Sequence, residues 1–216
     1  AVATALEVAR SRMEPLAALW RGLASGGWVA AIGYLVALAH GLRTGFCDPL
    51  EGSALYWLGG GAGALAGGAW GALVGLTSGL APRRRLAVAV LGALAGPAAG
   101  VMGGLWRFYA TPMVFAFDHF FGYFAGTVYD TELGGLGALA SFRAGTLLAL
   151  FAAGAIASLL RRQGRGFVLV AAPSRWALAV AALSAVGTVT HALAGAGLGH
   201  WSTSASIARA LGGREI

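Results

Sequence analysis

One apolar stretch of the chain carries a glycine at every fourth position. The series consists of Gly59, Gly63, Gly67, Gly71, Gly75 and Gly79. In water, each interior glycine costs a helix about 1 kcal/mol relative to alanine. In a lipid bilayer the helix is enforced because no water satisfies an open backbone, and glycines four apart leave a bare stripe where a second backbone packs closely. The series therefore predicts a membrane-spanning helix in a close-packed bundle.

The composition is also that of a membrane protein. Of the 216 residues, 58% are hydrophobic and 11% are charged, with a mean hydropathy of +0.74, whereas soluble domains are about one quarter charged. All 15 basic residues are arginines. They occur in short clusters between apolar stretches, which is typical of residues that orient membrane helices and not of a nucleic-acid-binding surface. We therefore expect membrane lipid as a partner and no nucleic acid.

Five apolar stretches are long enough to cross a hydrocarbon core of about 30 Å, which takes about 20 helical residues. They are residues 23–42, 54–81, 86–106, 136–160 and 176–198. We predict an all-α fold, a polytopic transmembrane helix bundle of five spans over residues 23–198.

The arginines orient these spans. Ten of them lie before the first span, between the second and third, and between the fourth and fifth; the other five lie on the opposite side. Arginine-rich loops stay in the cytoplasm, so we expect a cytoplasmic N-terminus and a periplasmic C-terminus. Residues 1–22 mix leucine and tryptophan with arginine, which predicts an amphipathic segment on the cytoplasmic surface. Residues 199–216 are expected to form an outer surface helix and tail.

The segment 107–133 is rich in phenylalanine and carries Asp118 and His119 near its centre. A full crossing here would place the arginines of 161–165 outside and an unpartnered carboxylate in lipid. We therefore expect an interfacial or re-entrant outer segment. Aromatic side chains are enriched at the cores of protein interfaces. The candidates for contact with a partner or with lipid are Phe115, Phe117, Phe120, Phe121 and Phe124.

The third span carries a second four-residue glycine ladder, joined to the first ladder by a short turn. It consists of Gly92, Gly96, Gly100 and Gly104. The two spans are expected to form a tight antiparallel hairpin through their ladders. We predict that Gly67→Leu or Gly71→Leu breaks up this hairpin or the complex that contains it. The alternative use of such a ladder is to line a small-solute channel.

Candidate chemistry gathers at the outer side, where all four histidines are expected. His191 lies on a track that is otherwise glycine, and it either binds a cofactor such as haem or chlorin or hydrogen-bonds across a helix interface. His191 and His119 with Asp118 form a possible cofactor or metal set, since imidazole and carboxylate suit zinc, copper or iron. No pair has a recognised ligand spacing, so the cofactor is unknown. No catalytic residue is predicted, because no serine-protease motif and no carboxylate within a span core is present.

Three stretches resemble parts of an uncharacterised polytopic membrane module of bacterial proteins from GC-rich, deltaproteobacterial-type genomes. They are residues 46–52, 108–131 and 199–213. The resemblance implies a bacterial inner membrane and a larger periplasmic part after the module, and it implies no activity. Together with the abundant packing glycines, it favours an anchor or accessory subunit of a membrane assembly that contacts other membrane subunits. The alternatives are a cofactor-binding subunit and a channel.

Overall fold

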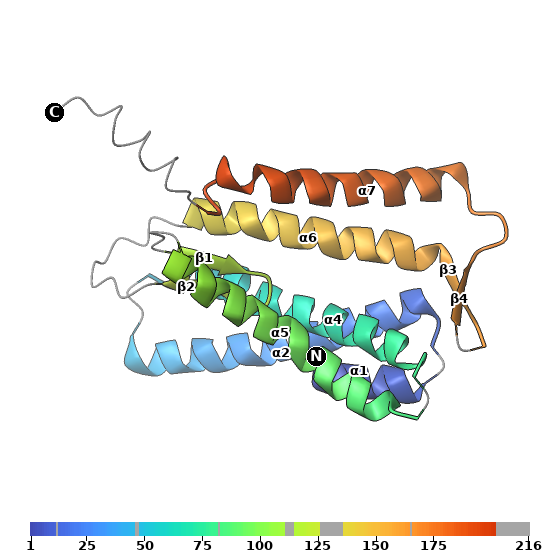
Figure 1. Cartoon of the computed structure of the whole chain (residues 1–216). Coiled ribbons are helices and arrows are strands. Elements are labelled where there is room, and N and C mark those ends of the chain that lie inside the picture. Colours follow the sequence, from blue (N-terminus) through green and yellow to red (C-terminus); the bar gives the residue numbers. More distant parts are fainter. Residues whose placement is uncertain are drawn as a thin grey trace.

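The computed structural model describes residues 1–11, 13–45, 48–81, 83–110, 115–125, 136–164 and 166–201, and the chain is mostly helical. Its long helices lie roughly along one direction (Figure 1). Four helices in the described part are long and apolar enough to cross a membrane. They are α2 (Pro15–Thr44), α5 (Arg85–Ala110), α6 (Leu136–Ser158) and the helix Arg175–Ala196, which comprises α7 (Arg175–Leu193) and the 3-10 turn η2 (Ala194–Ala196).

The predicted span 54–81 differs from the other four. It forms three consecutive pieces, namely α3 (Pro49–Tyr56), the π turn η1 (Trp57–Gly61) and α4 (Ala62–Ser78). The segment begins before residue 54 because Asp48 caps α3, its carboxylate accepting the N–H groups of Leu50 and Glu51 at 2.9 Å each. The π turn interrupts the regular hydrogen bonding. α4 is the central helix, in contact with α1 (Val2–Arg10), α2, α5 and α6.

α2 and α4 pack backbone to backbone. A side chain at Gly68 would overlap the carbonyl oxygen of Gly22 and lie 2.9 Å from its carbonyl carbon. Gly26 of α2 lies equally close to the carbonyl group of Ala64. The two backbones therefore touch, as in glycine-mediated membrane contacts. The glycines at this crossing are not members of the predicted ladder.

The glycines of the first predicted ladder, Gly59 to Gly79, do not take part in this contact with α2. Gly63 lies against the backbone of Phe120, and Gly71 and Gly75 lie against α1. Gly79 lies near the side chain of Arg162. A Cβ at Gly59 or Gly67 has no atom within 4 Å. A Cβ at Gly71 meets the backbone of Ala1, so Gly71→Leu would displace the N-terminal segment, and the predicted break of the α4–α5 hairpin stays a prediction. Because α1 covers part of the stripe, the stripe does not line an open channel there.

The ladder of α5 is filled by side chains and not by the backbone of α4. Val74 and Trp70 occupy the spaces beside Gly92 and Gly96, and the indole N–H of Trp70 donates to the carbonyl of Gly92 at 3.0 Å. Asp118 occupies the space beside Gly100. The expectation that the two ladders meet backbone to backbone is wrong, because large side chains of α4 stand between them.

The first 22 residues do not form one surface helix. α1 packs against α4 and α5, with Ala5 and Val8 completely buried. Its small residues fit where Gly71 and Gly75 leave room. α2 begins at Pro15, so the first long helix takes up residues that were expected to lie outside it. α1 is thus a short helix inserted into the bundle at one end.

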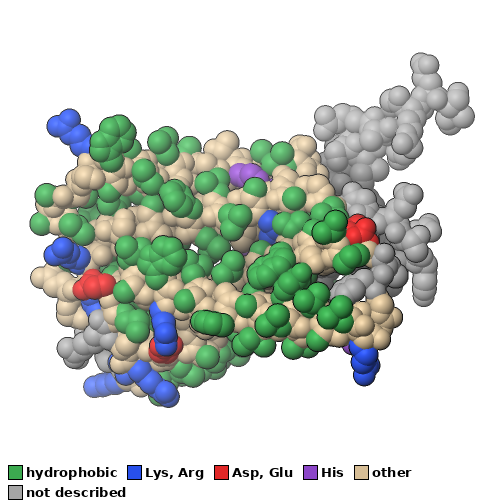
Figure 2. All heavy atoms as spheres, turned by 180° about the vertical axis from the view of Figure 1, so that it is seen from behind, with side chains coloured by type: hydrophobic (Ala, Val, Ile, Leu, Met, Phe, Trp, Pro, Cys, Tyr) green, Lys and Arg blue, Asp and Glu red, His purple; other side chains and the backbone are tan. Residues whose placement is uncertain are grey.

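Two β-hairpins close opposite ends of the molecule (Figure 1). β1 (Phe115–Asp118) pairs antiparallel with β2 (Gly122–Ala125), and this hairpin forms the described part of the predicted aromatic segment beyond α5. β3 (Leu160–Gln163) pairs with β4 (Gly166–Leu169) and joins α6 to α7. Figure 2 shows apolar side chains over the middle of one face and most of its arginines towards the β3–β4 end. Of the predicted outer tail, residues 202–216 lie outside the described residues.

Candidate functional site

A cavity of about 350 Å³ lies at the end of the bundle that carries the β1–β2 hairpin. Its walls come from α5, the hairpin, α6, α7 and the turn after η2. Its volume is in the range of small-molecule sites, which is about 300–1,000 Å³. The charged and imidazole side chains in its wall are Arg107, Asp118, His119, His191 and His200. The helical packing thus joins polar groups that are far apart in the sequence.

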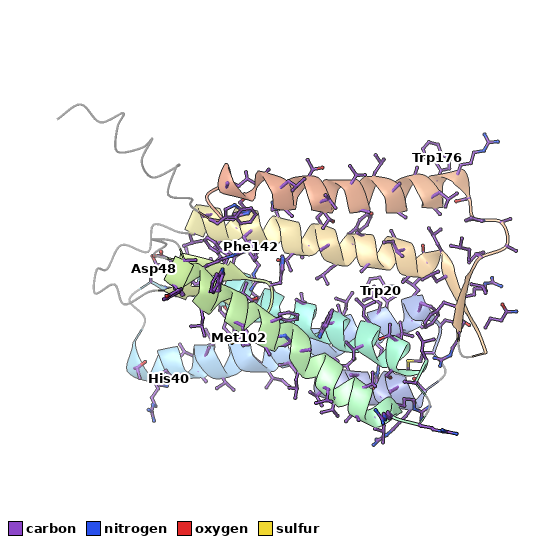
Figure 3. All side chains as sticks on the ribbon, in the orientation of Figure 1. Trp20, His40, Asp48, Met102, Phe142 and Trp176 are labelled. Atoms are coloured by element: carbon purple, nitrogen blue, oxygen red, sulfur yellow. The ribbon has the colours of Figure 1, made fainter. Side chains whose placement is uncertain are left out.

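Three histidines meet in this cavity around Phe142, whose position on α6 is labelled in Figure 3. His119 stacks on Phe142 with ring centroids 4.7 Å apart, and His200 meets the same ring edge-on at 5.4 Å. The rings of His191 and His200 are 5.2 Å apart. The close approach of His191 to α6 depends on Gly145, where any side chain would overlap the imidazole. Aromatic packing therefore holds the imidazoles in place.

Hydroxyl groups of α6 hold two of these rings. Nδ1 of His119 lies 2.8 Å from Oγ1 of Thr146, and Nε2 of His200 lies 3.1 Å from Oγ of Ser141. Burial lowers the pKa of both histidines. For His119 the positive charges of Arg143 and Arg107 lower the pKa further, while Asp118 raises it. Both imidazoles are therefore neutral near pH 7, and each neutral ring has one donor and one acceptor nitrogen.

Asp118 closes the hairpin and carries the carboxylate of the cavity. It is 7% exposed, and its Oδ1 accepts the N–H groups of Phe120 at 2.7 Å and Phe121 at 2.9 Å. Its Oδ2 lies over Gly100, where an added side chain would displace the carboxylate. The glycine of α5 thus lets the hairpin enter the bundle.

Arg143 ties the hairpin to two helices. The side chain is 1% exposed, and its guanidinium donates to three carbonyl groups, those of Leu58, Gly59 at 2.9 Å and His119 at 2.7 Å. Leu58 and Gly59 belong to the π turn, whose irregular hydrogen bonding leaves carbonyls available for other donors. From the sequence, Arg143 was expected only as one of the five arginines on the outer side. An arginine within an apolar stretch is usually functional, and this signal in the sequence could have identified Arg143.

The predicted metal set is only partly assembled. His119, His191 and Asp118 all line the cavity, yet no three His, Cys, Asp or Glu side chains of the described residues lie close enough to hold a metal ion. One nitrogen of His119 is engaged with Thr146, and Asp118 is engaged in the turn. Among the described residues, the arrangement does not supply three ligands for a metal ion.

Two other predicted groups have different positions. His40 is exposed and points away from the bundle, so it is not part of the site (Figure 3). Phe117 is 7% exposed and stacks on Phe142, so it belongs to the core and is not free for a partner. Phe120 packs edge-on against Trp70, while Phe121 is 47% exposed. The side chains of Phe115 and Phe124 lie outside the described part of the chain.

No protein-family model, curated protein or solved structure matches this chain. The resemblance to a bacterial membrane module stays a prediction. The functional inference therefore depends on the geometry of the cavity and on the helices that build it.

Proposed function

We propose that this protein is an integral membrane subunit that binds a small polar ligand in the histidine-lined cavity. The observation that carries the proposal is the convergence of three imidazoles, one carboxylate and Arg107 on a single hollow from separate elements. Ionisable groups are costly within a membrane bundle and are usually functional there. A hollow with a few convergent polar groups is the usual form of a ligand site.

In this proposal the protein crosses the bacterial inner membrane five times. The four long apolar helices supply four of these crossings. The remaining one, second in chain order, is the continuous helical segment formed by α3, η1 and α4, which packs against α2, α5 and α6. The β3–β4 end carries Arg161 and Arg162, and the turn between α4 and α5 at the same end carries Arg83 and Arg84. Because arginine-rich loops stay in the cytoplasm, this end faces the cytoplasm. The cavity at the opposite end then faces the periplasm, and α1 enters the bundle from the cytoplasmic side, with Ala1 against Gly71.

The proposal keeps the anchor or accessory role in a larger assembly. The exposed side chain of Phe121 lies on the hairpin at the cavity end, where a periplasmic partner would meet the bundle. Aromatic residues are frequent anchors at such contacts. Co-purification followed by mass spectrometry tests this part. Recovery of the same stoichiometric partner by the native protein, and its loss in Phe121→Ser, is the expected result.

The cavity itself is tested by filling it. Gly103 lines the cavity and a Cβ there has no atom within 4 Å, so Gly103→Leu adds a large side chain at the cavity wall with no clash at its Cβ. Gly137 also has open space but does not line the cavity, so Gly137→Leu is the matched control. Native mass spectrometry of the purified protein is expected to detect a bound small molecule in the wild type and the control, and none in Gly103→Leu.

An absorption spectrum of the same samples identifies the ligand class. A Soret or chlorin band would assign a pigment cofactor, and its absence with a bound mass would assign a colourless ligand. Equal ligand masses in all three proteins, or no bound mass together with no thermal stabilisation by any compound of a metabolite panel, would rule out the proposed function.

A further inference from the structure

An apolar groove of about 590 Å³ runs between α2 and α6, away from the histidine cavity. Trp20 is 65% exposed and Phe151 is 60% exposed at its rim, while Leu19, at 2% exposure, forms part of its floor. Figure 3 shows Trp20 in the space between α2 and α6. Gly154 of α6 lies in the groove wall, where the missing side chain leaves room. The groove is therefore open to lipid along its length and floored by the bundle core.

The groove continues into a polar hollow at the β3–β4 end. This second hollow, of about 440 Å³, shares Leu16 with the groove and is lined by Ser158, Arg161 and Glu14. Arg161 is exposed. Glu14 is already engaged, because its Oε2 accepts the backbone N–H of Arg162 at 3.0 Å. The exposed guanidinium of Arg161 thus lies at the end of the apolar groove, in the same hollow as the Glu14 carboxylate.

The groove and the polar hollow together match one leaflet of a bilayer in length. On α6 the apolar groove is lined from Leu147 to Gly154, which is about 10 Å at 1.5 Å per helical residue, and the polar hollow extends the wall about 6 Å further, to Ser158. Half of a hydrocarbon core of about 30 Å is about 15 Å. The apolar part therefore lies within one leaflet, while Arg161 lies at the depth of the lipid headgroups.

We propose that this groove binds one acyl chain of an anionic phospholipid, whose phosphate pairs with Arg161. An acyl chain supplies the apolar occupant of the right length, and a guanidinium is the preferred side chain for bidentate phosphate contact. Basic pockets beside membrane helices at the cytoplasmic face recognise anionic headgroups. The charge of Arg161 favours an anionic headgroup over a zwitterionic one of equal chain length.

The experiment uses the delipidated protein in detergent, with phosphatidylglycerol and phosphatidylcholine of identical chains, read out by native mass spectrometry and thermal shift. Phosphatidylglycerol is expected to bind more tightly. Arg161→Gln is expected to weaken its binding about fivefold, to the level of phosphatidylcholine. The control Arg43→Gln changes an exposed arginine at the opposite end and is expected to leave binding unchanged.

A second variant tests the acyl-chain part. A Cβ at Gly154 has its nearest neighbour, Cδ2 of Leu19, at 3.7 Å, which is an ordinary contact, so Gly154→Leu places a large side chain in the groove wall with no clash at its Cβ. It is expected to reduce binding of both lipids at least tenfold, while Gly137→Leu leaves both unchanged. Equal affinity for the two lipids in the wild type, or unchanged binding in Gly154→Leu, would overturn the proposal. Binding of glycerol phosphate as tight as that of phosphatidylglycerol would also overturn the proposal.

Discussion

The contact between α2 and α4 offers the sharpest test of how this bundle is held together. We consider Gly68→Ala, the smallest side chain that tests it. The new Cβ would overlap the carbonyl oxygen of Gly22 and lie 2.9 Å from its carbonyl carbon and 3.2 Å from the backbone nitrogen of Gly26. All three neighbours are backbone atoms, which no rotamer change can move. The two helices must separate to admit one methyl group.

Overpacking of this kind costs about 1–3 kcal/mol. Alanine is also a better helix former than glycine by about 1 kcal/mol, which acts in the opposite direction. Gly67→Ala separates these effects, because a Cβ at Gly67 has nothing within 4 Å. Gly67→Ala therefore gains the helix propensity of alanine without the clash with α2. The difference between the two variants is therefore the cost of separating the helices, about 1–3 kcal/mol.

The measurement is the midpoint of thermal unfolding of both variants in the same detergent. A difference of 2 kcal/mol corresponds to about 4–8 °C for a chain of this size. We expect Gly68→Ala to melt below Gly67→Ala by that amount, with Gly67→Ala at or above the wild type. Equal melting temperatures for the two variants would refute the close contact of α2 and α4.

Two further predictions concern the cavity end of the bundle. Arg143→Met leaves the carbonyls of Leu58 and Gly59 without their charged donor, so it is expected to destabilise the protein by about 3 kcal/mol or more in the same unfolding assay. The control Arg43→Met changes an exposed arginine and is expected to cost about 0.5 kcal/mol or less. Because burial lowers the pKa of His119 in the folded protein, the unfolded chain binds protons more readily between that lowered pKa and about 6.5. Stability is then complete above about pH 6.5 and falls on acidification, and a melting temperature unchanged between pH 7.5 and 5.5 would contradict this.

Local features of the chain were sufficient to predict its helices. The long apolar stretches became α2, α5, α6 and α7, with ends within a few residues of those expected except where Pro15 begins α2 early. Hydropathy and helix propensity are properties of neighbouring residues, so a single sequence contains them. The β1–β2 hairpin and the π turn were not predicted in form; both make hydrogen bonds with Arg143 of a distant helix, which no local pattern contains.

The candidate site was predicted only in part for a related reason. Counting span ends predicted all four histidines at one end of the bundle, and His119, His191 and His200 line the cavity there while His40 does not. That these three meet, and that Phe117 is buried against Phe142, depends on how α6, α7 and the hairpin are placed relative to one another. No spacing along the chain encodes this placement.

By itself, the sequence determined a membrane-type helical protein with an arginine-rich end, since apolar length and charge are summed over adjacent residues. Only the tertiary structure decided which glycines carry the close contacts. Gly22, Gly26 and Gly68 meet backbone to backbone, whereas Gly67 faces open space. The physical reason is that a glycine permits close approach on any helix face, but whether another helix occupies that face depends on the packing of the whole bundle.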